Sequence, residues 1–377
     1  MNILIKPASG LCNMRCRYCF YEDESNHRSA KSMGIMDNRT ADMLIEEALK
    51  NAPRQEGVIF SFQGGEPTLA GIGYFQHFVE QVQLRNQHYR VPVQYAIQTN
   101  GLVLSDELLD LFARHRFLVG ISLDGNKAIH DTNRIDSHGE ETWGRILHNL
   151  SRLTARNIDV NILCVVTKAC ARSPRKVYTN LKKLNCRFLQ FIACLDPLEV
   201  PRGQMPYSLL PEEYGKFLCG LFDAWYLDWK KGSYVSIRLF DDYVHLAMGL
   251  PAGTCATSGT CGKYYVSEAD GGIYPCDFYV LDQWKLGKIG ENSLADIMES
   301  TRSAEFFREG MARPKRCAAC QWEPLCGGGC RRDWTEVNGE TENYYCSAFR
   351  AFFSYAYPRI LEIARAEYQA LRHRRGF

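Results

Sequence analysis

The amino-acid sequence predicts an α/β fold, in which a partial barrel of six β/α units is followed by a small cysteine-rich α+β region and a C-terminal helix. Three observations lead to this prediction. Strand-like runs alternate with helical patterns up to about residue 200 of the 377 residues. Beyond that point the alternation ends, and short segments rich in glycine follow. Eight of the 16 cysteines then lie between positions 255 and 346.

The expected strands are short apolar runs rich in Ile, Val, Phe and Leu. Their nearly continuous apolar character is typical of strands that are buried on both faces of a sheet. We expect six of them, at residues 2–8, 58–63, 93–99, 117–123, 160–167 and 188–194. Helical patterns separate them at residues 41–51, 73–86, 106–115, 142–156 and 174–184. Strands that alternate with helices of this length predict right-handed crossovers and a parallel sheet.

The predicted barrel is open on one side, because six units are fewer than the eight of a closed (β/α) barrel. Such an opening leaves room for a large substrate. Small or polar sequences follow three of the strands, at residues 64–67, 99–101 and 122–125. Parallel α/β folds bind ligands at the carboxyl ends of their strands, so we expect the functional site at this edge. Asn100 and Asp124 are candidates to line it.

The second half of the chain is organised differently. Residues 201–206 resemble a linker, an aromatic-rich helix is expected at 212–230, and a final helix at about 349–372. The Gly- and Cys-rich segment between them has too few core-forming residues to fold without bound metal. We therefore expect four parts: a barrel at 1–200, a helical linker at 201–252, a cysteine-rich domain at 253–348 and a C-terminal helix at 349–377.

The composition argues against several kinds of partner. Lysine and arginine number 45 against 43 for aspartate and glutamate, a formal net charge of +2, which disfavours nucleic acid. No run approaches the about 20 apolar residues that span a bilayer, and no secretory signal is visible, so we expect a cytoplasmic protein without a membrane partner. The absence of heptads and of an obvious apolar surface helix predicts a monomer.

Sixteen cysteines in a cytoplasmic chain indicate metal binding or catalysis rather than disulfides. Cys12, Cys16 and Cys19 have the spacing C-x3-C-x2-C and lie in the loop after the first expected strand. A four-iron cluster held by three cysteines keeps one iron free to bind a substrate or cofactor. The alternative is a zinc knuckle, but structural zinc needs four protein ligands, and His27 is the one nearby candidate for the fourth.

This loop resembles the signature of the radical S-adenosylmethionine superfamily, with an aromatic residue before the last cysteine. The sequence Gly-Gly-Glu-Pro at 64–67 resembles that family's GGEP motif, which holds the methionine amino group. The resemblance implies that a reduced 4Fe–4S cluster cleaves the sulfonium and yields a 5′-deoxyadenosyl radical, which abstracts hydrogen from an unactivated carbon. It further implies that S-adenosylmethionine contacts Tyr18, Gly64, Gly65, Glu66, Ser122, Arg134 and Leu195.

The C-terminal cysteines form a second group, with C-x2-C-x5-C-x3-C at its centre. Eight cysteines suffice for two fully ligated four-iron clusters or, as the alternative, for two zinc sites, and their spacing leaves the pairing open. The group resembles the SPASM extension of radical enzymes that modify peptides. That resemblance implies one cluster on Cys255, Cys261, Cys276 and Cys330, and another on Cys317, Cys320, Cys326 and Cys346. The other cysteines, which we expect to be packing residues, are Cys164, Cys170, Cys186, Cys194 and Cys219.

Longer stretches resemble the anaerobic sulfatase-maturating enzymes over nearly the whole chain. They lie at residues 4–9, 62–70, 98–101, 161–167, 188–192 and 274–280. The resemblance implies an enzyme that oxidises a cysteine or serine of an unfolded or nascent sulfatase, within a Cys/Ser-x-Pro/Ala-x-Arg motif, to Cα-formylglycine. It also implies three 4Fe–4S clusters and an electron donor such as ferredoxin or flavodoxin.

The same resemblance assigns roles to three further residues. Asp277, directly after Cys276, matches the family's base, which removes the thiol or hydroxyl proton while an auxiliary cluster takes the second electron. Its alternative role is a hydrogen-bond acceptor for the cluster loop, or a helix cap. Tyr21 and Gln63 lie beside the motifs and are candidates to touch the peptide, with packing as the alternative for both.

Three other functions compete with this one. A maturase that crosslinks ribosomally made peptides uses the same scaffold, often with an added N-terminal peptide-binding domain, for which a first strand at residue 2 leaves no room. A ferredoxin-like electron carrier predicts fully ligated clusters, against which the three-cysteine loop argues. A zinc-stabilised interaction module predicts a colourless protein, whereas an iron–sulfur protein is brown.

Overall fold

The computed structural model describes residues 1–262 and 264–374 and confirms the predicted α/β fold with a parallel sheet. Every neighbouring pair among the six predicted strands is parallel. Each strand lies within its predicted range. In the order of the sheet they are β1 (Asn2–Ile5), β3 (Val58–Phe62), β4 (Val93–Thr99), β5 (Leu118–Ser122), β7 (Val160–Val166) and β8 (Phe188–Ala193).

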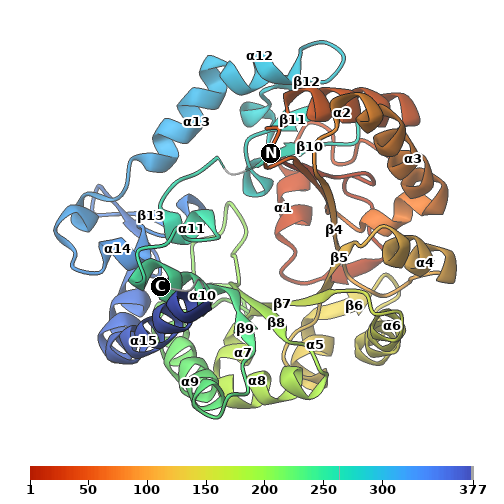
Figure 1. The fold of residues 1–377 in the computed structure, drawn as a ribbon. Coiled ribbons are helices and arrows are strands. Elements are labelled where there is room, and N and C mark those ends of the chain that lie inside the picture. The colour runs from red at the N-terminus through yellow and green to blue at the C-terminus, as the bar shows by residue number, and fades with distance from the viewer. Residues whose placement is uncertain (263, 375–377) are drawn as a thin grey trace.

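Helices cover the outside of the curved sheet, as Figure 1 shows. They are α2 (Asn38–Asn51), α3 (Gly71–Tyr89), α4 (Asp106–Arg114), α6 (Trp143–Ala155) and α8 (Pro174–Lys183). Side-chain caps start two of them, since Asp37 accepts the amide of Thr40 and Ser105 accepts that of Leu108. Aromatic rings fill the space between sheet and helices, where buried Phe62 lies 5.0 Å from the ring of Phe78 on α3.

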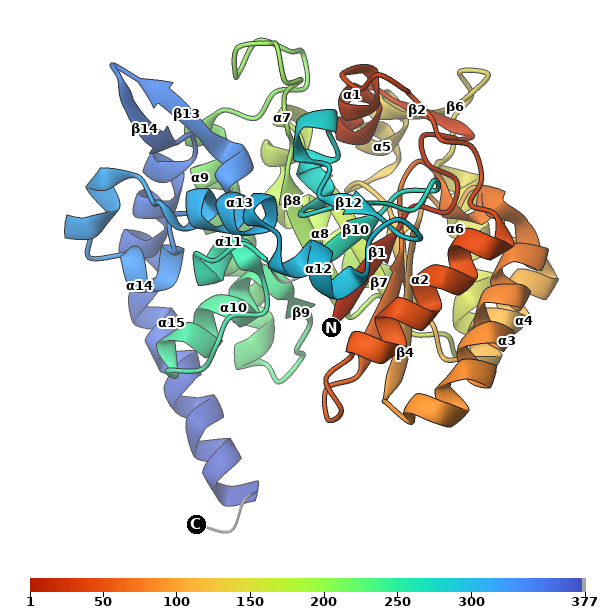
Figure 2. The same ribbon diagram turned by 90° about the horizontal axis from the view of Figure 1, so that it is seen from above.

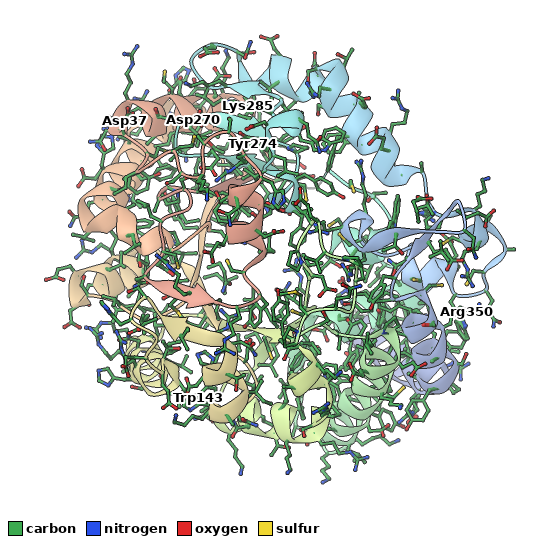
Figure 3. The ribbon with its side chains drawn as sticks, turned by 180° about the vertical axis from the view of Figure 1, so that it is seen from behind. Asp37, Trp143, Asp270, Tyr274, Lys285 and Arg350 are labelled. Carbon is green, nitrogen blue, oxygen red and sulfur yellow. The ribbon has the colours of Figure 1, made fainter. Side chains whose placement is uncertain are left out.

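The sheet continues beyond the six predicted strands, because the cysteine-rich region adds strands to the barrel. β10 (Tyr265–Ser267) pairs parallel with β1, and β11 (Gly272–Tyr274) and β12 (Gly287–Lys288) follow antiparallel. Figure 3 shows Lys285 and Asp270 side by side in this extension, where Nζ lies 3.2 Å from Oδ2. The predicted border between barrel and cysteine-rich domain stays a prediction, since both share one sheet.

The chain between barrel and extension is mostly helical and packs against the C-terminal helix. α9 (Pro211–Lys230) and α10 (Arg238–Ala247) both contact α15 (Cys346–Arg374), and β9 (Ser236–Ile237) joins the sheet edge beside β8. The ring of Phe222 on α9 lies 5.7 Å from that of Phe352 on α15. α15 begins at Cys346, three residues before the predicted start, and its far end projects beyond the other helices (Figure 2).

Short elements complete the fold. Those that carry or flank the predicted site are α1 (Phe20–Asn26), β2 (Met14–Cys16), β6 (Arg134–Asp136), η1 (Pro67–Ala70), η2 (Asp277–Tyr279) and η5 (Arg331–Asp333). The others are α5 (Lys127–Asn133), α7 (Lys168–Ala171), α11 (Cys255–Ser258), η3 (Asp282–Trp284), α12 (Leu294–Glu299), α13 (Thr301–Met311), η4 (Lys315–Ala319), α14 (Glu323–Cys326), β13 (Trp334–Val337) and β14 (Glu340–Asn343).

Candidate active site and cluster-binding cysteines

A short ladder ties the loop of the three N-terminal cysteines to the barrel. β2 pairs antiparallel with β6, so that Cys16 lies opposite Arg134. Cys19 caps α1, with its sulfur 3.4 Å from the backbone nitrogen of Glu22. The pKa of Cys12 is raised to about 11 and that of Cys16 to about 12, first by burial and to a lesser extent by the charges of neighbouring thiolates, which outweigh the lowering effects of the Met14 amide and of Arg134. A metal that binds here must therefore displace protons from three neighbouring thiols.

The GGEP turn packs against the cysteine loop, backbone to backbone. The amide of Gly65 donates to the Ser9 carbonyl at 2.8 Å, and the amide of Glu66 donates to the Leu11 carbonyl at 2.7 Å. A Cβ on Gly65 would lie 2.2 Å from that Leu11 oxygen, so only glycine fits. Gly64 has a φ of 135°, which side chains also disfavour. The two glycines therefore allow the close approach of this turn to the cysteine loop.

The Glu66 carboxylate fastens the ends of β3 and β4 together. It accepts hydrogen bonds from the Thr99 hydroxyl and the Asn100 amide, both at 2.7 Å. Asn100 donates in turn to Oδ1 of Asn13 at 2.8 Å, and its amide nitrogen lies 3.8 Å from the sulfur of Cys12. Burial raises the pKa of Glu66, while these hydrogen bonds lower it. Asn100, which the sequence placed at a strand end, thus adjoins the first cysteine.

Tyr18, Asp124 and Arg134 form a buried cluster on the other side of the cysteine loop. Nε of Arg134 donates to Oδ2 of Asp124 at 3.1 Å, and the Tyr18 hydroxyl donates to the same oxygen. The guanidinium lies 5.3 Å from the centre of the Tyr18 ring, and its Nη1 is 3.9 Å from the sulfur of Cys16. Asp124 therefore positions two of the residues that the sequence assigned to cofactor binding.

The two remaining predicted cofactor residues lie at the same edge of the sheet. Ser122 ends β5, and its hydroxyl accepts a hydrogen bond from Nε2 of Gln98 at 3.0 Å. Leu195 follows β8 and is half-buried. Its backbone carbonyl lies 3.7 Å from the thiol of Cys194. The contact of both side chains with a cofactor stays a prediction.

Asp277 lies at the centre of a set of side chains from three segments. It follows Cys276 after β11 and is 4% exposed. Nζ of Lys6, directly after β1, donates to Oδ1 at 2.5 Å, and Nε2 of Gln63, directly after β3, donates to Oδ2 at 2.7 Å. The ring of Tyr21 covers the Lys6 ammonium, with 3.7 Å from Nζ to the ring centre. Lys6, which is fully buried, therefore links Asp277 to Tyr21, and Gln63 joins the same set through Asp277.

Sequence reasoning missed Lys6 and a second layer of charged residues behind it. The sequence did contain a signal for Lys6, because a lysine directly after an apolar strand indicates a charged group at the strand end. Glu268, fully buried, accepts hydrogen bonds from the Tyr21 hydroxyl and from Nη1 of Arg28, the latter at 2.6 Å. Glu24 on α1 is also buried, at 1% exposure. Nothing in the local pattern marked Glu268, because its partner Arg28 lies 240 positions away in the chain.

The eight C-terminal cysteines fall into two spatial sets. The pKa of Cys330 is raised first by burial and then by the charges of Asp333, Cys276 and Cys255. The pKa of Cys261 is raised first by burial and then by the charge of Cys255. We call this group the inner set: Cys255, Cys261, Cys276 and Cys330. The outer set lines a cavity of about 370 Å³ near the exposed Arg350, which Figure 3 labels at the edge of the molecule: Cys317, Cys320, Cys326 and Cys346.

The donor chemistry of all three groups fits iron–sulfur clusters. Each group presents only thiols, the ligands that such clusters prefer. Among the described residues, no three His, Cys, Asp or Glu side chains converge as a single metal ion would require. Each C-terminal set offers the four thiols of a fully ligated four-iron cluster, and the three thiols of the N-terminal loop leave one iron open. Of the other cysteines, Cys164 and Cys170 are buried with their sulfurs 3.9 Å apart, as packing residues.

Fold and site together define a radical S-adenosylmethionine enzyme with an iron–sulfur extension. The sequence model of the Radical SAM superfamily matches residues 7–168. The model of SPASM, an iron–sulfur cluster-binding domain, matches residues 260–321. The first match contains all three cysteines of the N-terminal loop, and the second contains four of the eight C-terminal cysteines: Cys261, Cys276, Cys317 and Cys320.

Comparison with known proteins narrows this class to one family. The chain is 40% identical to the cysteine-type anaerobic sulfatase-maturating enzyme of Clostridium perfringens, over 97% of this chain and 98% of that protein. It is 27% identical to a serine-type enzyme of Bacteroides thetaiotaomicron, over 94% and 89%. The structure called native anSMEcpe with bound AdoMet and Cp18Cys peptide superposes with a TM-score of 0.91 at 39% identity, covering 97% and 99% of the two chains. The protein belongs to the anaerobic sulfatase-maturating enzyme family.

Proposed function

We propose that this protein oxidises a cysteine of a sulfatase polypeptide to Cα-formylglycine, within a motif of the Cys/Ser-x-Pro/Ala-x-Arg type. The observation that carries the proposal is the convergence of Lys6, Gln63 and Asp277 at the strand ends, near the three-cysteine loop. A carboxylate held by two donors suits a base that takes the substrate's proton. The match to cysteine-type relatives supports cysteine as the main target.

The cofactors are three 4Fe–4S clusters and S-adenosylmethionine, which when bound supplies abstraction of a hydrogen atom from the target Cβ. We assign the first cluster to Cys12, Cys16 and Cys19, and the other two to the inner and outer sets. Tyr18, Ser122, Arg134, Leu195 and the GGEP turn at 64–67 would hold S-adenosylmethionine.

The residues around Asp277 have separable tasks in this proposal. Lys6 and Gln63 orient the carboxylate, and Asp277 accepts the proton of the target thiol or hydroxyl. Tyr21, whose ring covers Lys6, keeps water away from the ammonium, which strengthens its attraction to the carboxylate. Because Asp277 directly follows Cys276, the second electron of the oxidation has a short path to the inner set.

Partner and location follow from the same chemistry. We propose an unfolded or nascent sulfatase as substrate, a small redox protein such as ferredoxin or flavodoxin as electron donor, and a monomeric enzyme. A cytoplasmic location is proposed because eleven ligand thiols require a reducing compartment. None of the helices in the described part of the chain is long and apolar enough to cross a bilayer.

The test is an anaerobic assay with a synthetic peptide that contains Cys-x-Pro-x-Arg. Reconstituted, reduced protein and S-adenosylmethionine should convert the cysteine to formylglycine, detected by mass spectrometry and by reaction of the aldehyde with a hydrazide. A peptide with alanine at the target position is the control. If 5′-deoxyadenosine forms while the cysteine peptide stays intact or becomes crosslinked, the protein is a maturase of another peptide.

A further inference from the structure

Glu24 is a buried carboxyl that the mechanism above does not use. It lies on α1, which packs against η2, where the ring of Phe20 is 4.9 Å from that of Phe278. At 1% exposure it is as buried as a core residue. Neither of its oxygens has a hydrogen-bond partner within the described part of the chain, and the amide of Val280 faces it without the geometry of a full hydrogen bond.

The charged groups that face Glu24 are those of the candidate active site. Burial, followed by the charge of Asp277, raises the pKa of Glu24 well above its ordinary value, while Lys6 and Arg332 lower it. Nε of Arg332, on η5, likewise has no hydrogen-bond partner among the described residues. Glu24 is thus a buried carboxyl with a raised pKa, and its charge interacts with that of the proposed base.

Buried polar groups almost always have hydrogen-bond partners, and where the protein supplies none an ordered water does so. A carboxyl with two open oxygens, next to a second polar atom without a partner, is a place at which water binds. The oxidation of cysteine to formylglycine consumes one water. Removal of two hydrogens from the Cβ–thiol unit yields a thioaldehyde, and its conversion to formylglycine replaces sulfur by the oxygen of water.

We propose that Glu24 holds this water and transfers protons during hydrolysis of the thioaldehyde; the inference rests on the proposed function. The water oxygen bonds to the thioaldehyde carbon, while the sulfur gains a proton from the Glu24 carboxyl and the water gives one back. The resulting hydroxythiol then breaks its C–S bond, forms C=O and releases hydrogen sulfide. No electron is transferred, and the sum is thioaldehyde plus water to aldehyde plus hydrogen sulfide.

This role of Glu24 predicts different effects of its replacement on cysteine and on serine targets. A serine target becomes an aldehyde directly when two hydrogens leave, so it needs no hydrolytic water. A cysteine target needs it in every turnover. Replacement of Glu24 should therefore slow product formation from cysteine peptides and leave hydrogen abstraction unchanged, which a merely structural role would not do.

The experiment is a single turnover of the reconstituted holoenzyme on the cysteine peptide, quenched in sodium borodeuteride. Thioaldehyde is reduced to deuterated cysteine and formylglycine to deuterated serine, so mass spectrometry separates the two. Glu24→Met, which keeps the volume without the carboxyl, should form 5′-deoxyadenosine at the wild-type rate. Its formation of deuterated serine should lag by about 10²-fold, the usual contribution of an acid–base group, while deuterated cysteine accumulates. Glu24→Gln should lie between the two.

Glu199→Gln is the matched control, because Glu199 is an exposed carboxylate near the end of α1, 3.4 Å from His27. It should behave as wild type. Equal rates of deuterated serine and 5′-deoxyadenosine in Glu24→Met would overturn the inference, and so would a parallel loss of both. Failure of the wild-type enzyme to convert the peptide would instead overturn the proposed function. Where the wild type accepts a serine peptide, Glu24→Met should convert it at the wild-type rate.

Discussion

At the scale of single residues, the pair of Lys6 and Asp277 has the strongest consequences. Both side chains are almost fully shielded from water, and the ammonium lies between the carboxylate and the Tyr21 ring. A buried charge without its partner is far more costly than a buried pair. The pair therefore serves stability and chemistry together, and the two roles can be separated by substitution.

Lys6→Met should destabilise the protein by about 3–5 kcal/mol, because it leaves the Asp277 carboxylate buried without a counter-charge. The double variant Lys6→Met with Asp277→Leu should recover most of this loss, although it should form no formylglycine. Thermal unfolding of the anaerobic holoproteins measures the stability of the single and of the double variant relative to the wild type. If Lys6→Met alone were as stable as the wild type, the claim that Lys6 compensates the buried charge of Asp277 would be wrong.

His130 should make the stability depend on pH. Burial lowers its pKa to about 4, and its Nδ1 accepts the amide of Asp124, which only a neutral ring can do. The pKa of a histidine in the unfolded chain is near 6.5. Between about pH 6.5 and 4, His130 therefore binds a proton in the unfolded chain but not in the folded chain, so the stability of the fold decreases as the pH drops through this range. The loss attributable to this residue is about 3 kcal/mol. His130→Gln should lack this part of the pH dependence when the free energy of unfolding is measured by denaturant titration at several pH values. If the free energies of the variant and the wild type decreased equally with pH, the role of His130 would be contradicted.

At the scale of elements, the ends of parallel strands and the cysteine loops account for most of the site. Alternation of apolar runs and helices predicted the six barrel strands, because strands buried on both faces leave an unmistakable pattern in the sequence. Motif spacing predicted the three-cysteine loop and the GGEP turn. Three-residue strands such as β10 left no pattern, so the extension of the sheet beside β1 was not foreseen. Lys6 and Glu24 were missed because Asp277, which pairs with Lys6 and whose charge acts on Glu24, comes from the distant segment around 264–280.

The cavity of the outer set leads to a prediction about iron content. Cys346→Ala removes one of its four thiols at the start of α15 and should lower the iron content by about four per chain, the content of one cluster. Cys219→Ala on α9 is the control and should retain all iron, since that thiol belongs to neither set. Colorimetric iron analysis of both reconstituted variants decides this. Full iron content in Cys346→Ala would show that the ligand is assigned wrongly.

At the scale of the whole molecule, the barrel and the cysteine-rich region form one continuous sheet. The junction of β1 with β10 places Asp277 of the extension against Lys6 of the barrel. Neither half contains the complete site. The open edge of the partial barrel is thus partly covered by the segment that supplies the proposed base.

Removal of iron should loosen the two halves unequally. The barrel supplies most of the buried apolar core, to which the segment from 253 to 348 adds fewer residues, such as Ile273 and Leu294. That segment has short elements, and we expect it to depend on metal to hold its loops. Hydrogen exchange of chelator-treated protein should therefore show lost protection around the inner and outer sets, and preserved protection in β3, β4 and β5. Uniform loss across the chain would indicate that the clusters stabilise the barrel equally.

The most direct test of the central claim, that substrate oxidation takes place beside Asp277, is a comparison of wild type with Asp277→Asn. Asparagine keeps the shape of the side chain and can still meet Gln63, but it cannot take a proton. The variant should still cleave S-adenosylmethionine to 5′-deoxyadenosine while its yield of formylglycine from the cysteine peptide falls by at least about 10²-fold. Wild-type yields of formylglycine from Asp277→Asn would contradict the account and place the base elsewhere.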